Sequence, residues 1–159
     1  DKESWDKHYS FTTMADVWNE IGIGQVMVDR VDSEAIENYG VADLNGEAKE
    51  PFRGVALKGL VEKPSPKDAP SNLAVLGRYI LPSKVLDLLE TTVAGVGGEI
   101  QLTGALDKLL KRDWLSVFET DADIFDCGNK QGFLSANLAV DMRDPDTRQS
   151  IKALIEKND

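Results

Sequence analysis

The sequence predicts an α/β fold, a mixed sheet with covering helices. Segments rich in β-branched residues are interspersed with segments whose apolar residues recur every three or four positions, and this mixture is typical of α/β proteins. Residues 73–81 also form a long apolar run of the kind found in strands buried on both faces, which requires helices packed on the sheet. A chain of 159 residues is long enough for one folding unit.

The first half of the chain is predicted to contain one helix and then strands. Apolar residues at helical spacing predict a helix over 13–21, and Gly22 ends it. β-Branched segments at 25–31, 39–42 and 55–61, separated by polar or glycine-containing turns, predict three strands. Three prolines within 62–71 predict an irregular loop before the fourth strand at 73–81.

The second half is predicted to be mainly helical. Pro82-Ser83 opens one helix, and leucines at helical spacing after Glu99 predict a second that ends at Lys111-Arg112. Short strands are predicted at 114–118 and 124–125, and the turn 126–130 leads into a helix over 133–142. Asp144-Pro145 breaks this helix before a last amphipathic one. The chain therefore divides into a partly unassigned segment, 1–24, and a main part, 25–159.

The composition disfavours several classes of function. Lys and Arg number 18 against 28 Asp and Glu, and the resulting net charge of −10 disfavours nucleic acid and anionic membrane surfaces as partners. We find no apolar stretch approaching the roughly 20 residues that span a bilayer, and we expect a cytoplasmic protein. Cys127 and His8 are the single residues of their kinds, so an internal disulfide is excluded and a protein-built zinc site is disfavoured.

Three polar clusters follow predicted strands, where ligands of open α/β sheets bind. In the first, Glu62 can accept hydrogen bonds from sugar hydroxyls and Lys63 can neutralise a phosphate. Because neighbouring strand residues point to opposite faces, the two reach one cleft only if the strand twists or ends between them. The alternative is a solvated charge pair before a turn.

The other two clusters precede predicted helices. Gly97 and Gly98 allow a ligand to approach the backbone and the free N–H groups of a helix start, whereas Glu99 is either part of such a site or only an acid matched to the helix dipole. Asp126 is suited to hold Mg²⁺ together with substrate phosphates. The alternative is that Asp126 or Asn129 caps the following helix.

The order of the motifs is more specific than any single motif. Val61-Glu62-Lys63-Pro64 is followed by Gly77-Arg78-Tyr79, by residues 97–103 and by the turn 126–132. In this order they resemble the second half of bacterial UTP:glucose-1-phosphate uridylyltransferase, the UDP-glucose pyrophosphorylase family of nucleotide-sugar nucleotidyltransferases. The similarity runs from about Gln25 through Met142 and includes Tyr39-Gly40-Val41.

The resemblance implies a fold, a reaction and two catalytic residues. The fold would be the C-terminal part of a Rossmann-like nucleotide-diphospho-sugar transferase. The reaction would join UTP to glucose 1-phosphate, forming UDP-glucose and pyrophosphate, with Mg²⁺ as cofactor and a homo-oligomeric assembly. Lys63 would contact the sugar phosphate and Asp126 would bind Mg²⁺, so that positioning and charge neutralisation carry the catalysis.

The resemblance also implies substrate-binding residues besides Lys63. Gly40 would lie against the glucose ring, where a side chain would intrude, and Glu62 would hydrogen-bond glucose hydroxyls. Glu99 would stand in the wall of the sugar pocket, and Lys130 would supply a nearby positive charge.

The sequence also departs from the family pattern. Residues 1–24 contain no counterpart of the family's glycine-rich phosphate loop or first metal-binding Asp, so we expect a fragment that lacks turnover alone and whose sheet exposes unpaired edges. Gly104 replaces a usual Asp, and Ile124 replaces a common basic residue. Two alternatives remain: a non-catalytic paralogue that assembles with an active partner, and a nucleotidyltransferase for another sugar or nucleotide.

Overall fold

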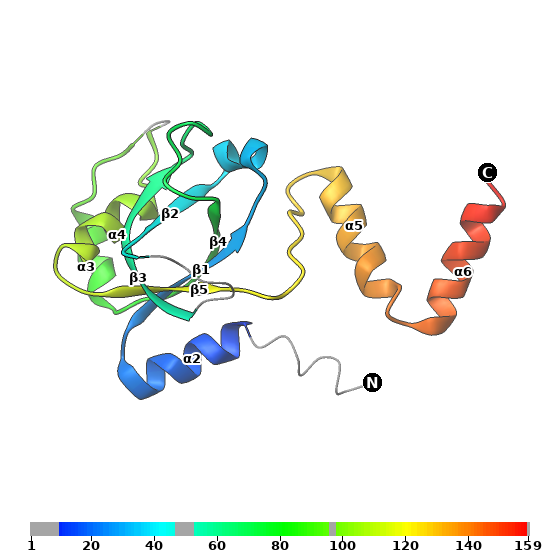
Figure 1. Cartoon of the computed structure of the whole chain (residues 1–159), viewed down its shortest axis with the longest axis horizontal. Coiled ribbons are helices and arrows are strands. Elements are labelled where there is room, and N and C mark those ends of the chain that lie inside the picture. Colours follow the sequence, from blue (N-terminus) through cyan, green and yellow to red (C-terminus); the bar gives the residue numbers. More distant parts are fainter. Residues whose placement is uncertain (1–9, 47–52, 96–97, 159) are drawn as a thin grey trace. The chain divides into compact units, whose positions relative to one another are not determined.

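The structure, a computed structural model, describes residues 10–46, 53–95 and 98–158 (Figure 1). Residues 1–9 of the N-terminal segment and Gly97 of the second polar cluster lie outside these ranges. The chain divides into two compact units, Asp1–Asp121 and Ala122–Asp159, which are described separately below.

The first unit contains the strands and most of the predicted elements. Its described elements are α2 (Ser10–Ile21), β1 (Gly24–Arg30), the 3-10 helix η1 (Ser33–Asn38), β2 (Gly40–Leu44), β3 (Arg53–Glu62), β4 (Leu73–Ile80), α3 (Lys84–Glu90), α4 (Leu102–Leu110) and β5 (Leu115–Glu119). The predicted strands at 25–31, 39–42, 55–61, 73–81 and 114–118 are thus confirmed. The helix predicted over 13–21 is confirmed as well, and the Gly22 N–H closes it by donating to the Trp18 carbonyl at 2.8 Å, with Gly22 at φ +66°.

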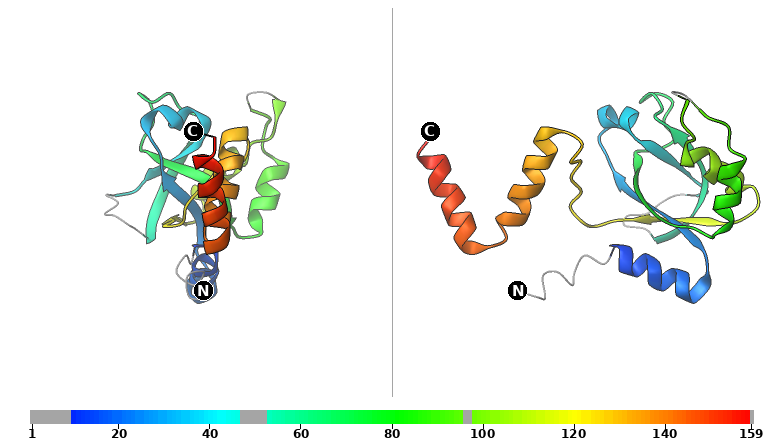
Figure 2. Two further views of the ribbon diagram at one scale, coloured as in Figure 1. Left: turned by 90° about the vertical axis from the view of Figure 1, so that its right-hand side faces the viewer. Right: turned by 180° about the vertical axis from the view of Figure 1, so that it is seen from behind.

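The sheet is mixed, as predicted, but it is closed. Its strands follow the order β1-β4-β2-β3-β5 and return to β1, so the expectation of unpaired sheet edges is wrong for the described strands (Figures 1 and 2). The β1–β5 pair is parallel and the other pairs are antiparallel. The closure depends on a single residue pair at one point, which we call the seam: β2 and β4 pair only through Val41 and Ala74.

Helices cover this sheet on both sides of β1. Val26 and Val28 lie in the main core with Ala105, Leu106 and Leu109 of α4. Met27, between the two valines, points the other way and packs with Met14 of α2 and Phe118 of β5. Strand β1 is therefore buried on both faces over Gly24–Val28, and β5 is buried along its whole length.

The prediction that β4 is buried on both faces is wrong. Leu73 and Ala74 are buried, but Gly77 and Arg78 are exposed. Gly77 has φ +67°, and the register against β1 shifts between Val26 and Val28, where β4 carries extra residues. Such a bulge bends the strand and re-aims its side chains, which an apolar sequence run does not reveal.

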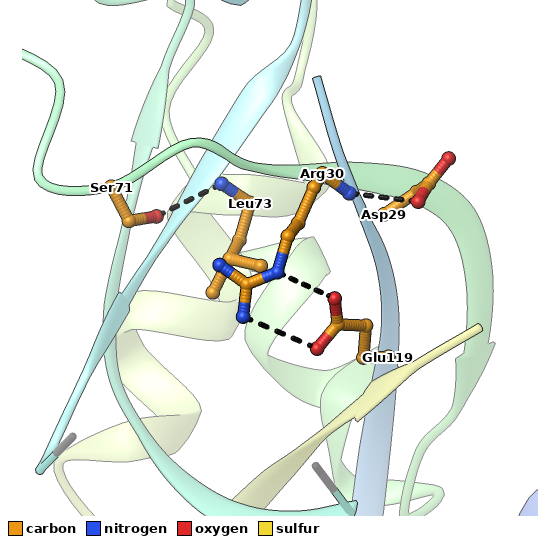
Figure 3. Close-up of polar contacts among 5 residues, drawn as sticks. All are labelled: Asp29, Arg30, Ser71, Leu73 and Glu119. Carbon is orange, nitrogen blue, oxygen red and sulfur yellow. Dashed lines mark hydrogen bonds and ion pairs between the residues drawn. The ribbon is translucent and has the colours of Figure 1, made fainter. Parts of the chain in front are cut away.

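A partly buried ion pair joins the ends of the parallel strands β1 and β5 (Figure 3). Arg30 Nε lies 2.7 Å from Glu119 Oε1, and Arg30 Nη2 donates to Glu119 Oε2 at 3.4 Å. The Arg30 backbone N–H donates to Asp29 Oδ1 at 2.8 Å. Nearby, Ser71 Oγ accepts from the Leu73 N–H at 3.1 Å and donates to the Ala42 carbonyl at 2.6 Å, which links the loop before β4 to β2.

The second unit contains two helices, α5 (Lys130–Asp141) and α6 (Pro145–Glu156). Asn129 caps α5 by accepting from the Gly132 N–H at 2.8 Å, and Asp144 caps α6 by accepting from the Thr147 N–H at 2.8 Å. Neither helix has a buried residue. The strand predicted at 124–125 is wrong, because these residues have no strand partner in the described structure and are not in a ladder. Among the described helices, none has the length and apolarity to cross a bilayer.

Candidate functional site

A cavity of about 230 Å³ lies at the seam of the sheet, where β2 and β4 diverge beyond the Val41–Ala74 pair. Its wall mixes aromatic, hydroxyl, amide and carboxylate groups with small apolar ones. The lining residues are Asn38, Tyr39, Gly40, Leu60, Glu62, Val75, Gly77, Tyr79, Gln101, Leu102 and Thr103. Hydrogen-bonding groups spread over an aromatic and apolar wall are suited to a small polar ligand such as a sugar. We call this cavity the seam cavity.

Glu62 is the acidic group of the seam cavity, and its carboxylate is held by a hydrogen bond from Thr103. It is the last residue of β3 and pairs with Gly40 of β2. Glu62 Oε2 accepts from Thr103 Oγ1 at 2.7 Å, and a Cβ added to Gly40 would lie 3.2 Å from the same oxygen. A larger residue at position 40 would therefore press on the carboxylate, and this contact gives Gly40 a role independent of any ligand.

The negative charge of Glu62 acts on the Tyr79 hydroxyl. Burial raises the pKa of the Tyr79 hydroxyl above its usual value, and the negative charge of Glu62 raises it further. The phenol therefore stays protonated at neutral pH and can donate a hydrogen bond into the seam cavity.

Lys63 reaches a second hollow that adjoins the first. Strand β3 ends at Glu62, and Lys63 takes the left-handed conformation, with φ 45°, while its N–H donates to the Tyr39 carbonyl at 3.0 Å. The strand thus ends between the two residues, and both line a hollow of about 560 Å³. Its other lining residues are Leu60, Gly95, Gln101, Thr103, Gly104 and Asp107. We call this the lysine hollow; Glu62, Thr103, Leu60 and Gln101 border both spaces.

Glu99 does not line either hollow. It is exposed before α4, and its backbone carbonyl accepts from the Gly95 N–H at 2.9 Å. Helix α4 begins at Leu102 rather than at residue 99. Gln101 and Thr103 stand in the wall where Glu99 was expected.

Asp126 and Lys130 belong to the second unit. Asp126 Oδ1 accepts from the Gly128 N–H at 2.9 Å, and Asp126 Oδ2 accepts from the Asn129 side-chain amide at 3.3 Å. Gly132 is required beside this turn, because a Cβ there would overlap the Asp126 carbonyl oxygen. Lys130 is the exposed first residue of α5. The roles that the resemblance implies for Asp126 and Lys130 stay predictions.

The Asp126 carboxylate suits a magnesium ion that is shared with phosphates. It is exposed, carries negative charge and is oriented by two hydrogen bonds, which leaves lone pairs on both oxygens. The described residues contain no cluster of three or more His, Cys, Asp or Glu that could hold a metal. An ion at Asp126 would therefore take further oxygens from elsewhere, as Mg²⁺ does with substrate phosphates.

The site contains residues that sequence reasoning did not single out. Thr103 and Tyr79 belong to the motifs 97–103 and 77–79, but the sequence assigned neither residue a role. Tyr79 had a signal in its spacing, because Val75, Gly77 and Tyr79 occupy alternate positions of one predicted strand, which places them on one face. Thr103 gave no comparable signal, because its contact with Glu62 joins residues 41 positions apart.

Comparison with known proteins identifies the family. The sequence profile described as nucleotidyl transferase matches residues 5–143. The UTP–glucose-1-phosphate uridylyltransferase of Haemophilus influenzae is 39% identical over 150 residues, which is 94% of this chain and 51% of the relative. The chain thus spans about half the length of the curated relatives that it matches.

Solved structures agree with this similarity. A UTP-bound UGPase from Acinetobacter baumannii has a TM-score of 0.77 and 37% identity, covering 89% of this chain and 48% of that one. A UDP-glucose pyrophosphorylase complexed with UDP-glucose has a TM-score of 0.78 and 32% identity, covering 87% of this chain and 52% of that one. With a family profile that matches most of its length, the chain belongs to the nucleotidyl transferase family.

Proposed function

We propose that this chain is the C-terminal, sugar-1-phosphate-binding part of a nucleotidyltransferase that forms UDP-glucose and pyrophosphate from UTP and glucose 1-phosphate. The observation that carries the proposal lies at the end of β3, where the carboxylate of Glu62 and the positively charged side chain of Lys63 line the lysine hollow together. Glu62 supplies an acceptor for sugar hydroxyls, and Lys63 supplies the positive charge that a sugar phosphate needs. The relatives carry names that state this reaction.

The remaining residues of the first unit shape the sugar site. Gly40 leaves room beside the Glu62 carboxylate, and Tyr79 and Thr103 add hydroxyl groups to the wall. The Glu99 carbonyl accepts from the N–H of Gly95, which lines the lysine hollow, so we assign Glu99 a supporting place in the loop behind this wall. A site with many hydrogen-bonding groups distinguishes sugars strongly, because a missing hydroxyl leaves a polar group of the wall without its partner.

In the proposed reaction a phosphate oxygen of glucose 1-phosphate attacks the α-phosphorus of UTP, and the bond to pyrophosphate breaks. Both reactants are anionic, so Lys63 lowers the repulsion between them as they meet. No covalent enzyme intermediate is needed, and orientation of the two substrates supplies much of the rate. We assign UTP recognition to sequence outside this chain, and Lys130 adds positive charge near Asp126 on the second unit.

Asp126 is the residue that would hold magnesium. When bound, Mg²⁺ neutralises developing charge on the phosphates. The contribution of this chain is to orient the carboxylate, which the Gly128 N–H and the Asn129 amide do. Gly132 maintains that turn by leaving space for the Asp126 carbonyl.

Calorimetric titration with glucose 1-phosphate tests the sugar site on the chain as it stands. Glu62→Gln and Lys63→Met should each weaken binding by about 10- to 150-fold, since a hydrogen bond to a charged group contributes about 1.5–3 kcal/mol. Lys58→Met is the matched control, because Lys58 is a lysine of β3 that is paired with Asp43 at 2.7 Å and lines neither hollow. Equal affinities for all variants would refute the assignment.

Turnover tests the fragment interpretation. The 159-residue chain should form no UDP-glucose from UTP and glucose 1-phosphate, and measurable product would contradict the proposal that UTP is recognised elsewhere. Adding the chain to a full-length relative tests the alternative of a regulatory paralogue, which requires subunit exchange and altered activity.

The sugar and the nucleotide are open to a second assignment. Gly104 lines the lysine hollow and contributes no side chain to its wall, and a Cβ added there would contact Thr92 at 3.4 Å. An open wall admits a bulkier sugar than a filled one. Ranking the affinities for UDP-glucose, dTDP-glucose and ADP-glucose, and for other sugar 1-phosphates, decides between a UDP-glucose-forming enzyme and a nucleotidyltransferase for another sugar or nucleotide.

A further inference from the structure

We infer that Thr103 is a positioning residue: its hydroxyl fixes the Glu62 carboxylate in the wall between the seam cavity and the lysine hollow, so that the pair accepts two hydrogen bonds from neighbouring hydroxyls of one ligand. The fixing of Glu62 follows from the geometry of the chain. Only the identity of the ligand, a sugar, rests on the proposed function.

The need for fixing follows from where Glu62 lies. It is the last residue of β3, the next residue turns away with a left-handed backbone, and the Glu62 side chain is exposed. A free glutamate in such a place has several rotamers, and a ligand that binds it has to order one of them at a cost in entropy. The Thr103 hydroxyl, which donates to Glu62 Oε2 at 2.7 Å, selects one of these rotamers before a ligand arrives.

The hydrogen bond also determines that both partners can only accept hydrogen bonds from a ligand. The Thr103 hydroxyl has one proton and gives it to Glu62 Oε2, so Thr103 Oγ1 can offer only lone pairs to the hollows. Glu62 Oε1 is likewise an acceptor. Two acceptors side by side match a ligand that donates two hydrogen bonds, as adjacent sugar hydroxyls do, and they reject a ligand that lacks one of these donors.

The hydrogen bond is not needed to hold α4 in place. Ala105, Leu106 and Leu109 on the same helix are buried in the main core, whereas the Glu62–Thr103 contact is exposed. A purely structural role for Thr103 would therefore leave the behaviour of Glu62 unchanged when the hydroxyl is removed.

Tyr79 provides a readout that needs no ligand, because the charge of Glu62 adds to the raised pKa of its hydroxyl. Alkaline absorbance titration of the chain, with the Tyr79→Phe curve subtracted, follows this hydroxyl. Glu62→Gln should lower the Tyr79 pKa, Thr103→Val should lower it in the same direction because the released carboxylate turns into solvent, and Thr103→Ser should leave it in place. A Thr103→Val curve that coincides with the parent curve while Glu62→Gln shifts it would overturn the positioning role, as would an absence of any shift in Glu62→Gln.

Ligand selectivity tests the second half of the inference. The ratio of the Kd values for glucose 1-phosphate and for its singly deoxygenated analogues should fall tenfold or more in Thr103→Val for one analogue, and Thr103→Ser should retain the parent ratio. An unchanged ratio for every analogue would overturn the two-acceptor arrangement. If the parent chain binds no glucose 1-phosphate, the proposed function and the two-acceptor reading fail together, whereas the titration of Tyr79 still decides whether Thr103 fixes Glu62.

Discussion

Removing Arg30 should destabilise the protein more than removing its partner Glu119. The Glu119 side chain is only 9% exposed and the Arg30 side chain is 30% exposed, although they share one ion pair of 2.7 Å. In Arg30→Met a nearly buried carboxylate loses its counter-charge. The cost should be about 3 kcal/mol, the lower end for buried pairs, because water still reaches the arginine side. Glu119→Met leaves a charge that water can solvate, and should cost about 1 kcal/mol.

A double-mutant cycle measures the pair itself. The variant carrying both methionines buries no unpaired charge, so it should be nearer to the parent than Arg30→Met is, and the coupling should be about 2 kcal/mol. Urea unfolding gives each free energy. The same cycle on Lys58 and Asp43 is the matched control, since that pair has the same 2.7 Å distance but exposures of 62% and 29%, and its coupling should not exceed about 1 kcal/mol. Additive effects at Arg30 and Glu119, within about 0.5 kcal/mol, would refute the reasoning.

Three other features give predictions. Folding raises the Tyr79 pKa, so the stability that this residue contributes is complete below about pH 10 and is lost as the pH rises through the pKa of the folded state. The free energy of unfolding in urea, measured between about pH 9 and 11, should therefore fall more steeply for the parent than for Tyr79→Phe, by at most about 1.4 kcal/mol per pH unit. Gly132→Ala should disrupt the Asp126 turn and cost α5 its cap, about 1 kcal/mol, with faster amide exchange in the first turn of α5, whereas Ser135→Ala should not. Lys108→Met should cost about 1 kcal/mol in thermal unfolding, because Lys108 Nζ donates to the Thr91 carbonyl at 2.7 Å at the end of α3; an unchanged midpoint would contradict this.

The strands were predictable because their signals are local. β-Branched residues mark β1, β2 and β3, and each of these segments is extended in the structure. Closure of the sheet was not predictable, since it depends on β3 meeting β5 and β2 meeting β4 across long separations in the sequence. The same limit explains residues 124–125: an apolar pair predicts a strand only if another strand lies beside it.

The candidate site was predictable where consecutive residues carry it. Glu62 and Lys63 stood out as a charge pair, and the condition for joint action, an end of the strand between them, is met. Thr103 was not predictable as a partner of Glu62, because no periodicity connects an α4 residue to the end of β3. For Glu99 the resemblance implied a place in the wall of the sugar pocket, and that role stays a prediction; α4 begins three residues later, and Thr103 of this helix lines both hollows.

Strands β2 and β4 are joined by the single Val41–Ala74 pair, next to the seam cavity, so this is the weakest link in the closed sheet. Parting a long ladder would require many backbone groups to lose their partners at once, whereas here few have to separate before β2 and β4 can spread. Local breathing of this kind lies at the low end of the opening energies within a folded domain. The Ser71 hydroxyl, which donates to the Ala42 carbonyl at 2.6 Å, adds a second link between β2 and the start of β4 at this point.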